Sequence, residues 1–248
     1  MEEKMFKSMF VLILLVSFNI SASDIEKRFD FLEARLTAVD NNLPIAGFSE
    51  SDIPGFTYVQ LTSGQILTVS NDGEFLFSGP LYRITEDQFI DIAEQKAAVA
   101  RAEYLKDNDL FDLSPITFAA EGVAKKRIFV FTDISCGFCR KLHQETVPGL
   151  QAAGVEVNYL GFPREGLAGM AKQSLDTAFC ADDKQDTLTR LKRNEGVEPI
   201  ACDSPVASHY ELARQLGIKS TPAILTSEGT LTLGYRPVPE MLSVLNVK

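Results

Sequence analysis

Two cysteines three positions apart, Cys136 and Cys139, are the residues of this chain best suited to chemistry. The apolar run Arg127–Phe131 before them predicts a buried strand, and the residues from Cys136 to about Thr146 predict a helix. The first turn of a helix offers unpaired N–H groups and the positive end of the helix dipole. These stabilise an anion by roughly 1–2 kcal/mol, which lowers a thiol pKa by about one unit. Cys136 is therefore a candidate thiolate for attack on disulfides.

The spacing of the two cysteines suggests a division of labour. Residues at positions i and i+3 lie on one side of a helical turn, so both sulfurs meet at the helix start. We expect Cys136, at the tip, to be exposed and to attack, and Cys139, one turn further in, to be shielded and to resolve. Gly137 and Phe138 carry no charge, so they would tune the pair through backbone geometry and packing.

A C-x-x-C pair is also half of a structural zinc site, which is the main alternative. The remaining cysteines do not form a second such pair, and His143 would lie about 10 Å further along the helix. We therefore favour thiol chemistry, expect no metal and no cofactor, and interpret His143 and His209 as structural.

The other two cysteines, Cys180 and Cys202, lie in a region that reads as helical, between residues 165 and 216. Neither has a partner at exchange spacing, so a structural disulfide is the natural interpretation. Closing a loop of this length contributes about 3 kcal/mol in the chain-entropy model. A second redox centre is the alternative.

The N-terminus predicts export. Lys4 and Lys7 precede the apolar run Met9–Phe18 and the small residues Ser21–Ser23, which is the order of a secretory signal peptide over residues 1–23. The run is shorter than the roughly 20 residues that span a bilayer. An uncleaved interfacial anchor is the alternative. Four cysteines in an exported chain fit an oxidising compartment.

Composition narrows the classes of partner. The chain has 248 residues, 45% of them hydrophobic, and a net charge of −10 without a Lys/Arg-rich run. This argues against nucleic acid or an anionic membrane as a partner. The length is comfortable for two domains.

Pattern changes along the chain predict three parts after the signal peptide. Residues 24–85 begin with an amphipathic helix, continue through a stretch rich in Pro, Gly and Asn, and end in short β-type runs with turn signals at 63–64 and 71–73. A sheet this small buries little, so we expect it to pair with a second copy, the alternative being that it packs on the larger domain. Residues 86–108 lack Gly and Pro and predict a linker helix. Residues 109–248 show βαβ order, a helical insertion, and a strand–turn–strand after Thr221–Pro222. The β-type runs are Phe56–Leu61, Gln65–Ser70, Glu74–Phe77 and Leu81–Ile84.

The active-site stretch and several distant motifs together resemble the DsbC/DsbG family of periplasmic disulfide isomerases, over nearly the whole mature chain. These stretches are 131–143, 159–164, the Cys180/Cys202 spacing, 209–210, 220–223 and 79–82. Two positions depart from the best-known member. Phe138 stands where it has a tyrosine, and Arg140 stands where it has a histidine.

The resemblance implies an α+β protein with a thioredoxin-like catalytic domain that carries a helical insertion. A small N-terminal antiparallel, cystatin-like dimerisation domain would be joined to it by the linker helix. It also implies a V-shaped homodimer whose apolar cleft holds misfolded substrates. Pro222 would be cis beside the C-x-x-C, with the Thr221 backbone pairing with substrate. A membrane-embedded, DsbD-like thiol reductase would keep the dithiol reduced in the periplasm.

Our leading hypothesis is that the protein isomerises and reduces incorrect disulfides in exported proteins. Cys136 would attack a wrong disulfide, the freed substrate thiol would re-attack, and Cys139 would resolve stalled complexes. Two alternatives are a substrate-restricted reductase or oxidase of DsbG type and a periplasmic holdase chaperone.

Overall fold

The computed structural model describes residues 22–62, 65–86 and 89–247 of the chain. Most of the expected signal peptide and the turn expected at 63–64 lie outside these residues. The chain divides into two compact units between Gly79 and Pro80, and each is described by itself. Within the described residues, no helix combines the length and the apolar character needed to cross a membrane.

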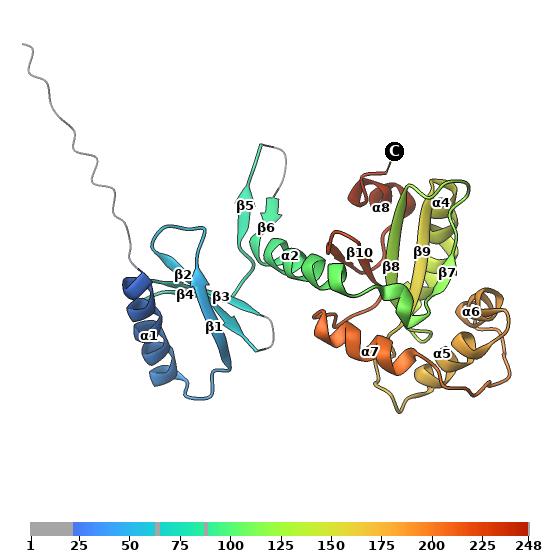
Figure 1. The fold of residues 1–248 in the computed structure, drawn as a ribbon, viewed down its shortest axis with the longest axis horizontal. Helices are drawn as coiled ribbons and strands as arrows, with labels where there is room; N and C mark the ends of the chain where they lie inside the picture. The colour runs from blue at the N-terminus through green and yellow to red at the C-terminus, as the bar shows by residue number, and fades with distance from the viewer. Residues whose placement is uncertain (1–21, 63–64, 87–88, 248) are drawn as a thin grey trace, which may run out of the picture. The chain divides into compact units, whose positions relative to one another are not determined.

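The first unit is a helix packed on a small antiparallel sheet (Figure 1). Helix α1 (Ala22–Val39) is followed by β1 (Ile45–Glu50), β2 (Phe56–Leu61), β3 (Ile66–Ser70) and β4 (Leu76–Phe77), in the sheet order β1-β2-β3-β4. Leu32 of α1 is fully buried in a core with four side chains of β2 and β3, namely Val59, Leu61, Leu67 and Val69. Strand β1 lies in the Pro/Gly/Asn-rich stretch, where the sequence pattern alone did not predict a strand.

The second unit opens with a hairpin and a helix. Strand β5 (Tyr82–Ile84) pairs with β6 (Phe89–Asp91) and not with the sheet of the first unit. Helix α2 (Ile92–Asp107) starts after this hairpin, later than the expected start near residue 86, because residues 89–91 are extended. The Asp91 carboxylate caps it by accepting from the Glu94 amide at 3.1 Å.

Helix α2 is held against the turn between two strands of the second unit, β10 (Ala223–Thr226) and β11 (Leu231–Leu233). Arg101 Nε donates to Gly229 O at 2.7 Å, and Glu94 Oε1 accepts from the Leu231 amide at 3.3 Å. Gly229 has φ +80°, and a Cβ there would collide with the backbone of Ala98. The helix expected as a linker is therefore fastened to the second unit.

A five-stranded sheet forms the centre of the second unit, in the order β11-β10-β8-β9-β7 (Figure 1). Strand β8 (Lys126–Thr132) is parallel to β9 (Val155–Gly161), whereas β7 (Ile116–Phe118), β10 and β11 run antiparallel to their neighbours. Alternate residues of β8 pack into two different hydrophobic cores. Ile128 and Val130 point into one, and Phe129 and Phe131 into the other. Burial on both faces explains the continuous apolar sequence of this strand.

The helix after β8 carries the two cysteines. It runs as α3 (Gly137–Lys141), a π-helical segment (Leu142–Thr146) and α4 (Val147–Ala152), which extends the expected helix to residue 152. In the π-helical segment the Val147 amide bonds Leu142 O, five residues back. One extra residue is thereby accommodated in this turn.

The helical insertion packs beside the sheet. It consists of α5 (Met170–Cys180), α6 (Lys184–Lys192) and α7 (Val206–Gln215), and α8 (Val238–Val244) ends the chain. A disulfide between Cys180 and Cys202 ties the end of α5 to the segment before α7. A short 3₁₀ turn, Leu110–Leu113, joins α2 to β7.

Candidate active site

Cys136 occupies the N-cap of α3 and has the features of a stabilised thiolate. Its sulfur accepts from the Cys139 amide at 3.4 Å and lies 3.4 Å from Thr221 O. The pKa of Cys136 is lowered from 9.0 to about 5, chiefly by the hydrogen bond from the Cys139 thiol, which together with the other donors outweighs burial. The buried Thr221 hydroxyl bonds no oxygen or nitrogen in the described part of the chain, and it favours the thiolate further.

Cys139 has the opposite character. Burial raises the pKa of the Cys139 thiol well above its ordinary value, and the hydrogen bond to Cys136 raises it further. At neutral pH the pair therefore holds one proton, with Cys136 as thiolate and Cys139 as thiol. This is the asymmetry that an attacking and a resolving cysteine require.

The expected exposure of Cys136 is wrong. Its exposed fraction is 3%, close to the 1% of Cys139. The cause is the Thr221–Pro222 loop, whose carbonyl lies against the Cys136 sulfur. The apolar side chain at the surface of this turn is Phe138, which is 63% exposed.

The Thr221–Pro222 peptide is cis. The sheet carries this loop to the cysteines, because Ala223 of β10 is paired with Phe131 near the end of β8. Pro222 O accepts from the Gly234 amide at 2.8 Å, which fixes the loop from the other side. The structure thus brings four of the expected substrate-contact residues to one place: Gly137, Phe138, Thr221 and Pro222.

A buried carboxylate organises the loop that leads into α3. Asp133 is fully buried, and it accepts from the Ser135 amide at 2.7 Å and from Arg164 Nε at 3.1 Å. Although burial opposes ionisation, hydrogen bonds from Arg164 and Ser135 hold the pKa of Asp133 below its ordinary value. Arg164 also lowers the pKa of Cys136 through its charge. The sequence reasoning assigned no role to either member of this pair.

Lys192, at the end of α6, is a third charged residue of the site that the sequence reasoning missed. It is fully buried, and its Nζ donates to Thr132 Oγ1 at 2.5 Å and to Asp133 O at 3.0 Å. The available signal was its spacing from Leu188, because positions i and i+4 share a helix face and Leu188 is buried.

Both histidines are engaged in packing. His143 Nδ1 lies 2.9 Å from Tyr159 Oη, and His143 Nε2 lies 3.1 Å from Thr189 Oγ1. His209 Nδ1 accepts from the Gly161 amide at 3.0 Å, and its Nε2 donates to Leu113 O at 2.7 Å. Burial lowers the pKa of each to about 4, so both are neutral at pH 7.

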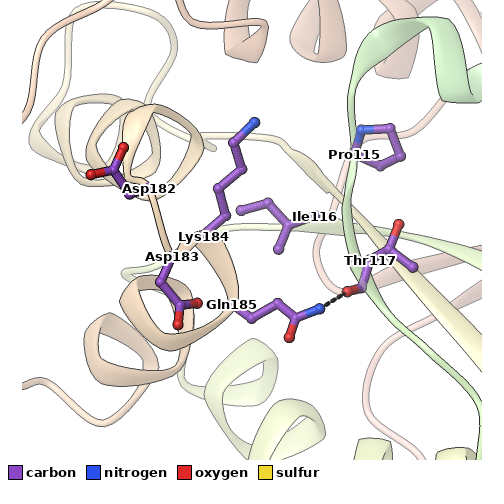
Figure 2. A pocket seen from close by; sticks show the side chains of 7 residues that line it. All are labelled: Pro115, Ile116, Thr117, Asp182, Asp183, Lys184 and Gln185. Carbon is purple, nitrogen blue, oxygen red and sulfur yellow. Dashed lines mark hydrogen bonds between the residues drawn. The ribbon is translucent and has the colours of Figure 1, made fainter.

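A surface hollow between β7 and the start of α6 lies apart from the cysteines. Figure 2 shows that it is bounded by Pro115, Ile116 and Thr117 on one side and by residues 182–185 on the other. Gln185 Nε2 donates to Thr117 O across it, and Asp183 caps α6 by accepting from the Asp186 amide at 2.9 Å. The side chains of Gln185 and Asp183 therefore serve the fold.

Comparison with known proteins gives the family. The chain matches the family model of a thioredoxin-like domain over residues 116–247 and that of the disulfide bond isomerase N-terminal domain over residues 21–94. It is 34% identical over 221 residues to the thiol:disulfide interchange protein DsbC of Escherichia coli, covering 87% of this chain and 89% of the relative. It is 35% identical to DsbC of Salmonella typhimurium, over 75% of each chain.

A solved structure of a Proteus mirabilis ScsC linker-deletion variant shares the fold alone. The TM-score is 0.51 at 18% identity, over 62% of this chain and 85% of that one. Fold, dithiol and relatives agree, and the chain belongs to the DsbC family of thiol–disulfide isomerases.

Proposed function

We propose that this disulfide isomerase acts through Cys136 as the attacking thiolate and Cys139 as the resolving thiol. The observation that carries the proposal is the asymmetric pair. The pKa of Cys136 is about 5, that of Cys139 is raised, and the two are hydrogen-bonded at the start of α3. A thiolate is the form that attacks disulfides, and a low pKa also makes Cys136 a good leaving group.

The reaction follows from these states. The Cys136 thiolate bonds one sulfur of a substrate disulfide and releases the other as a thiolate, which gives a mixed disulfide. The freed substrate thiolate attacks elsewhere in the substrate until a thiolate attacks the mixed disulfide and expels Cys136. If none does, Cys139 attacks Cys136, the substrate leaves reduced, and the enzyme holds a Cys136–Cys139 disulfide.

Substrate contacts are proposed for the residues around the sulfur. The exposed Phe138 offers an apolar surface beside Cys136, and Gly137 leaves the approach open, with the nearest atom to a Cβ there at 3.8 Å. The Thr221 carbonyl of the Thr221–Pro222 loop lies 3.4 Å from the sulfur. We assign to the Thr221 backbone the pairing with an extended substrate segment.

The deciding experiment compares the wild-type chain with the Cys136→Ala and Cys139→Ala variants on a scrambled multi-disulfide protein. Cys136→Ala should abolish reactivation, whereas Cys139→Ala should retain part of it and accumulate mixed disulfides. Full reactivation by Cys136→Ala would refute the assignment. A parallel assay on the fully reduced substrate separates isomerisation from oxidation. The DsbC relatives favour the isomerase over a DsbG-type reductase and over a holdase.

Location and partners belong to the same proposal. We assign residues 1–23 as a cleaved signal peptide and the periplasm as the compartment, with misfolded disulfide-containing exported proteins as substrates. A DsbD-like membrane reductase would return the enzyme to its dithiol form. The Cys180–Cys202 disulfide is assigned a structural role, because it joins the end of α5 to the segment before α7, apart from the exchange pair.

A homodimer formed through residues 24–85 completes the proposal, and chaperone-like holding of substrates would follow from its apolar cleft. In the first unit, Leu76 and Phe77 of the edge strand β4 expose 47% and 57% of their surface, and the preceding Phe75 exposes 60%. An apolar edge strand with unpaired backbone groups is suited to pairing with a second copy.

A further inference from the structure

The buried Lys192 has no role in the reaction described so far. Its ammonium group bonds two neutral acceptors, Thr132 Oγ1 and Asp133 O, and it forms no ion pair within the described residues. The Asp133 carboxylate is engaged elsewhere, with Arg164 and Ser135. Removing such a charge from water costs several kcal/mol, and an apolar side chain of similar size is often the more stable choice. Stability alone therefore does not account for this lysine.

Lys192 is linked to the two cysteines by a shared hydrogen-bond acceptor and by electrostatic interaction. The Asp133 carbonyl that accepts from Nζ also accepts from the Cys136 amide at 3.4 Å. Burial lowers the pKa of Lys192 to about 8, and the group that favours its charge most is Cys139. Because this pKa lies one unit above pH 7, the side chain is about nine-tenths protonated at pH 7.

The other charged groups near Lys192 either favour its ammonium form less than Cys139 does or oppose it. Asp133 and Cys136 also favour its ammonium form, and Arg140 opposes it. His143 is neutral, its pKa lowered by burial and by the Lys192 charge. In the reverse direction, the Lys192 charge lowers the pKa of Cys139, against the effect of burial.

We propose that Lys192 is a positioning residue for the resolving step, a buried counter-charge that stabilises the Cys139 thiolate as it forms. This rests on the proposed roles of Cys136 and Cys139. In the mixed disulfide, Cys136 no longer carries a charge, so the Cys139 thiolate becomes the anion that Lys192 faces. Cys139 loses its proton to water and attacks the Cys136 sulfur, and the bond from Cys136 to the substrate sulfur breaks. The departing substrate thiolate takes up a proton, so protons and electrons balance.

The test uses the reduced full-length protein and the aromatic disulfide dithiobis(nitrobenzoate). Attack by Cys136 releases one coloured thiolate and resolution by Cys139 releases the second, so one stopped-flow trace reports both steps. Lys192→Met should slow the second phase on the order of tenfold, the equivalent of one pKa unit, and leave the first within about twofold. Arg193→Met removes the same charge from the neighbouring exposed position and should leave both phases unchanged.

The pH profile separates a charge effect from a structural one. In the wild type the rate of the second phase should rise with pH and level off near pH 8, where Lys192 loses its charge. Lys192→Met should lack that break and unfold at an equal or higher temperature than the wild type. Equal slowing of both phases, an unchanged second phase, or a retained break would each overturn the proposal.

A measurement without any variant covers the case in which Lys192→Met does not fold. The pKa of Lys192, followed by NMR of its Cε in the wild-type chain, should be higher in the reduced than in the oxidised form. An identical pKa in both forms would overturn the inference and leave the proposed function intact. A Cys136→Ala variant that still releases the coloured thiolate in a fast first phase would instead overturn the proposed function.

Discussion

The two sulfurs of the site show how strongly position alone can change the pKa of identical side chains. Cys136 and Cys139 are three residues apart, yet the first receives hydrogen bonds at a helix start and the second is buried one turn further in. The sequence predicted this asymmetry from the spacing. It did not predict that Cys136 is covered, because the resemblance placed Pro222 beside the C-x-x-C but did not place the Thr221 carbonyl against the Cys136 sulfur.

The protonation of Cys136 can be measured directly. Iodoacetamide alkylates thiolates, so labelling of the reduced protein at Cys136 should follow a titration with its midpoint near pH 5. In the folded protein the pKa of Cys136 is depressed below 9.0. The Cys136 thiolate therefore contributes its full stabilisation of the reduced protein at pH values above 9.0. The contribution is lost as the pH falls toward 5. A Cys136→Ser variant should show no such loss, and a labelling midpoint near 9 would contradict the assignment.

The Arg164–Asp133 pair gives a second prediction at this scale. Arg164→Met removes a charge that favours the Cys136 thiolate, and it leaves the buried Asp133 with fewer donors. The labelling midpoint should rise by about half a unit to one unit, and the protein should lose about 1–3 kcal/mol of stability. Arg214→Met, at a 64% exposed arginine on α7, is the matched control and should change neither. If both variants behave alike, Arg164 has no specific role.

At the scale of elements, periodic segments were predicted well and short pairings were not. Strands β2 and β10 agree with the expected Phe56–Leu61 and Ala223–Thr226, because their apolar runs are bounded by turn residues. Strand β1 lies in a stretch of turn-forming residues, where pairing with β2 determines its conformation. Strand β7 has only three residues, too few for a local pattern. Such elements are fixed by their partners and not by local sequence.

The contact between α2 and the β10–β11 turn can be tested through two glycines of similar conformation. Gly229 and Gly234 have φ of +80° and +83°, but a Cβ meets backbone only at Gly229. Gly234→Ala should cost about 1–2 kcal/mol from backbone strain alone. Gly229→Ala should cost more and accelerate hydrogen exchange at the amides of residues 98–102. Equal exchange in both variants would show that α2 is not held by this turn.

At the scale of the whole molecule, the family follows from the combination of an N-terminal isomerase domain with a thioredoxin-like domain. The sequence predicted both parts, because motifs spread over most of the chain carry the resemblance. It did not predict Lys192, because a lysine within a helix is ordinarily a surface residue and only the packing of α6 buries it.

The proposed homodimer makes a prediction at this scale. Leu76→Lys places a charge on the exposed edge strand β4, so the protein should shift from dimer to monomer in light scattering. Isomerase activity on scrambled protein should fall, whereas single-turnover attack on a small disulfide should persist. Val123→Lys, at an 88% exposed position of the second unit, is the control. An unchanged mass for Leu76→Lys would argue against dimerisation through β4.

The π-helical segment Leu142–Thr146 has a consequence for insertions and deletions. Each residue of an α-helix turns the chain by about 100°, so one added residue would normally rotate everything before it away from its partners. The wide turn absorbs that rotation. Cys139 and Val147, on either side of this wide turn, are both buried. Deleting one residue between 142 and 146 should therefore restore a regular α-helix and leave the dithiol in line with the Thr221–Pro222 loop.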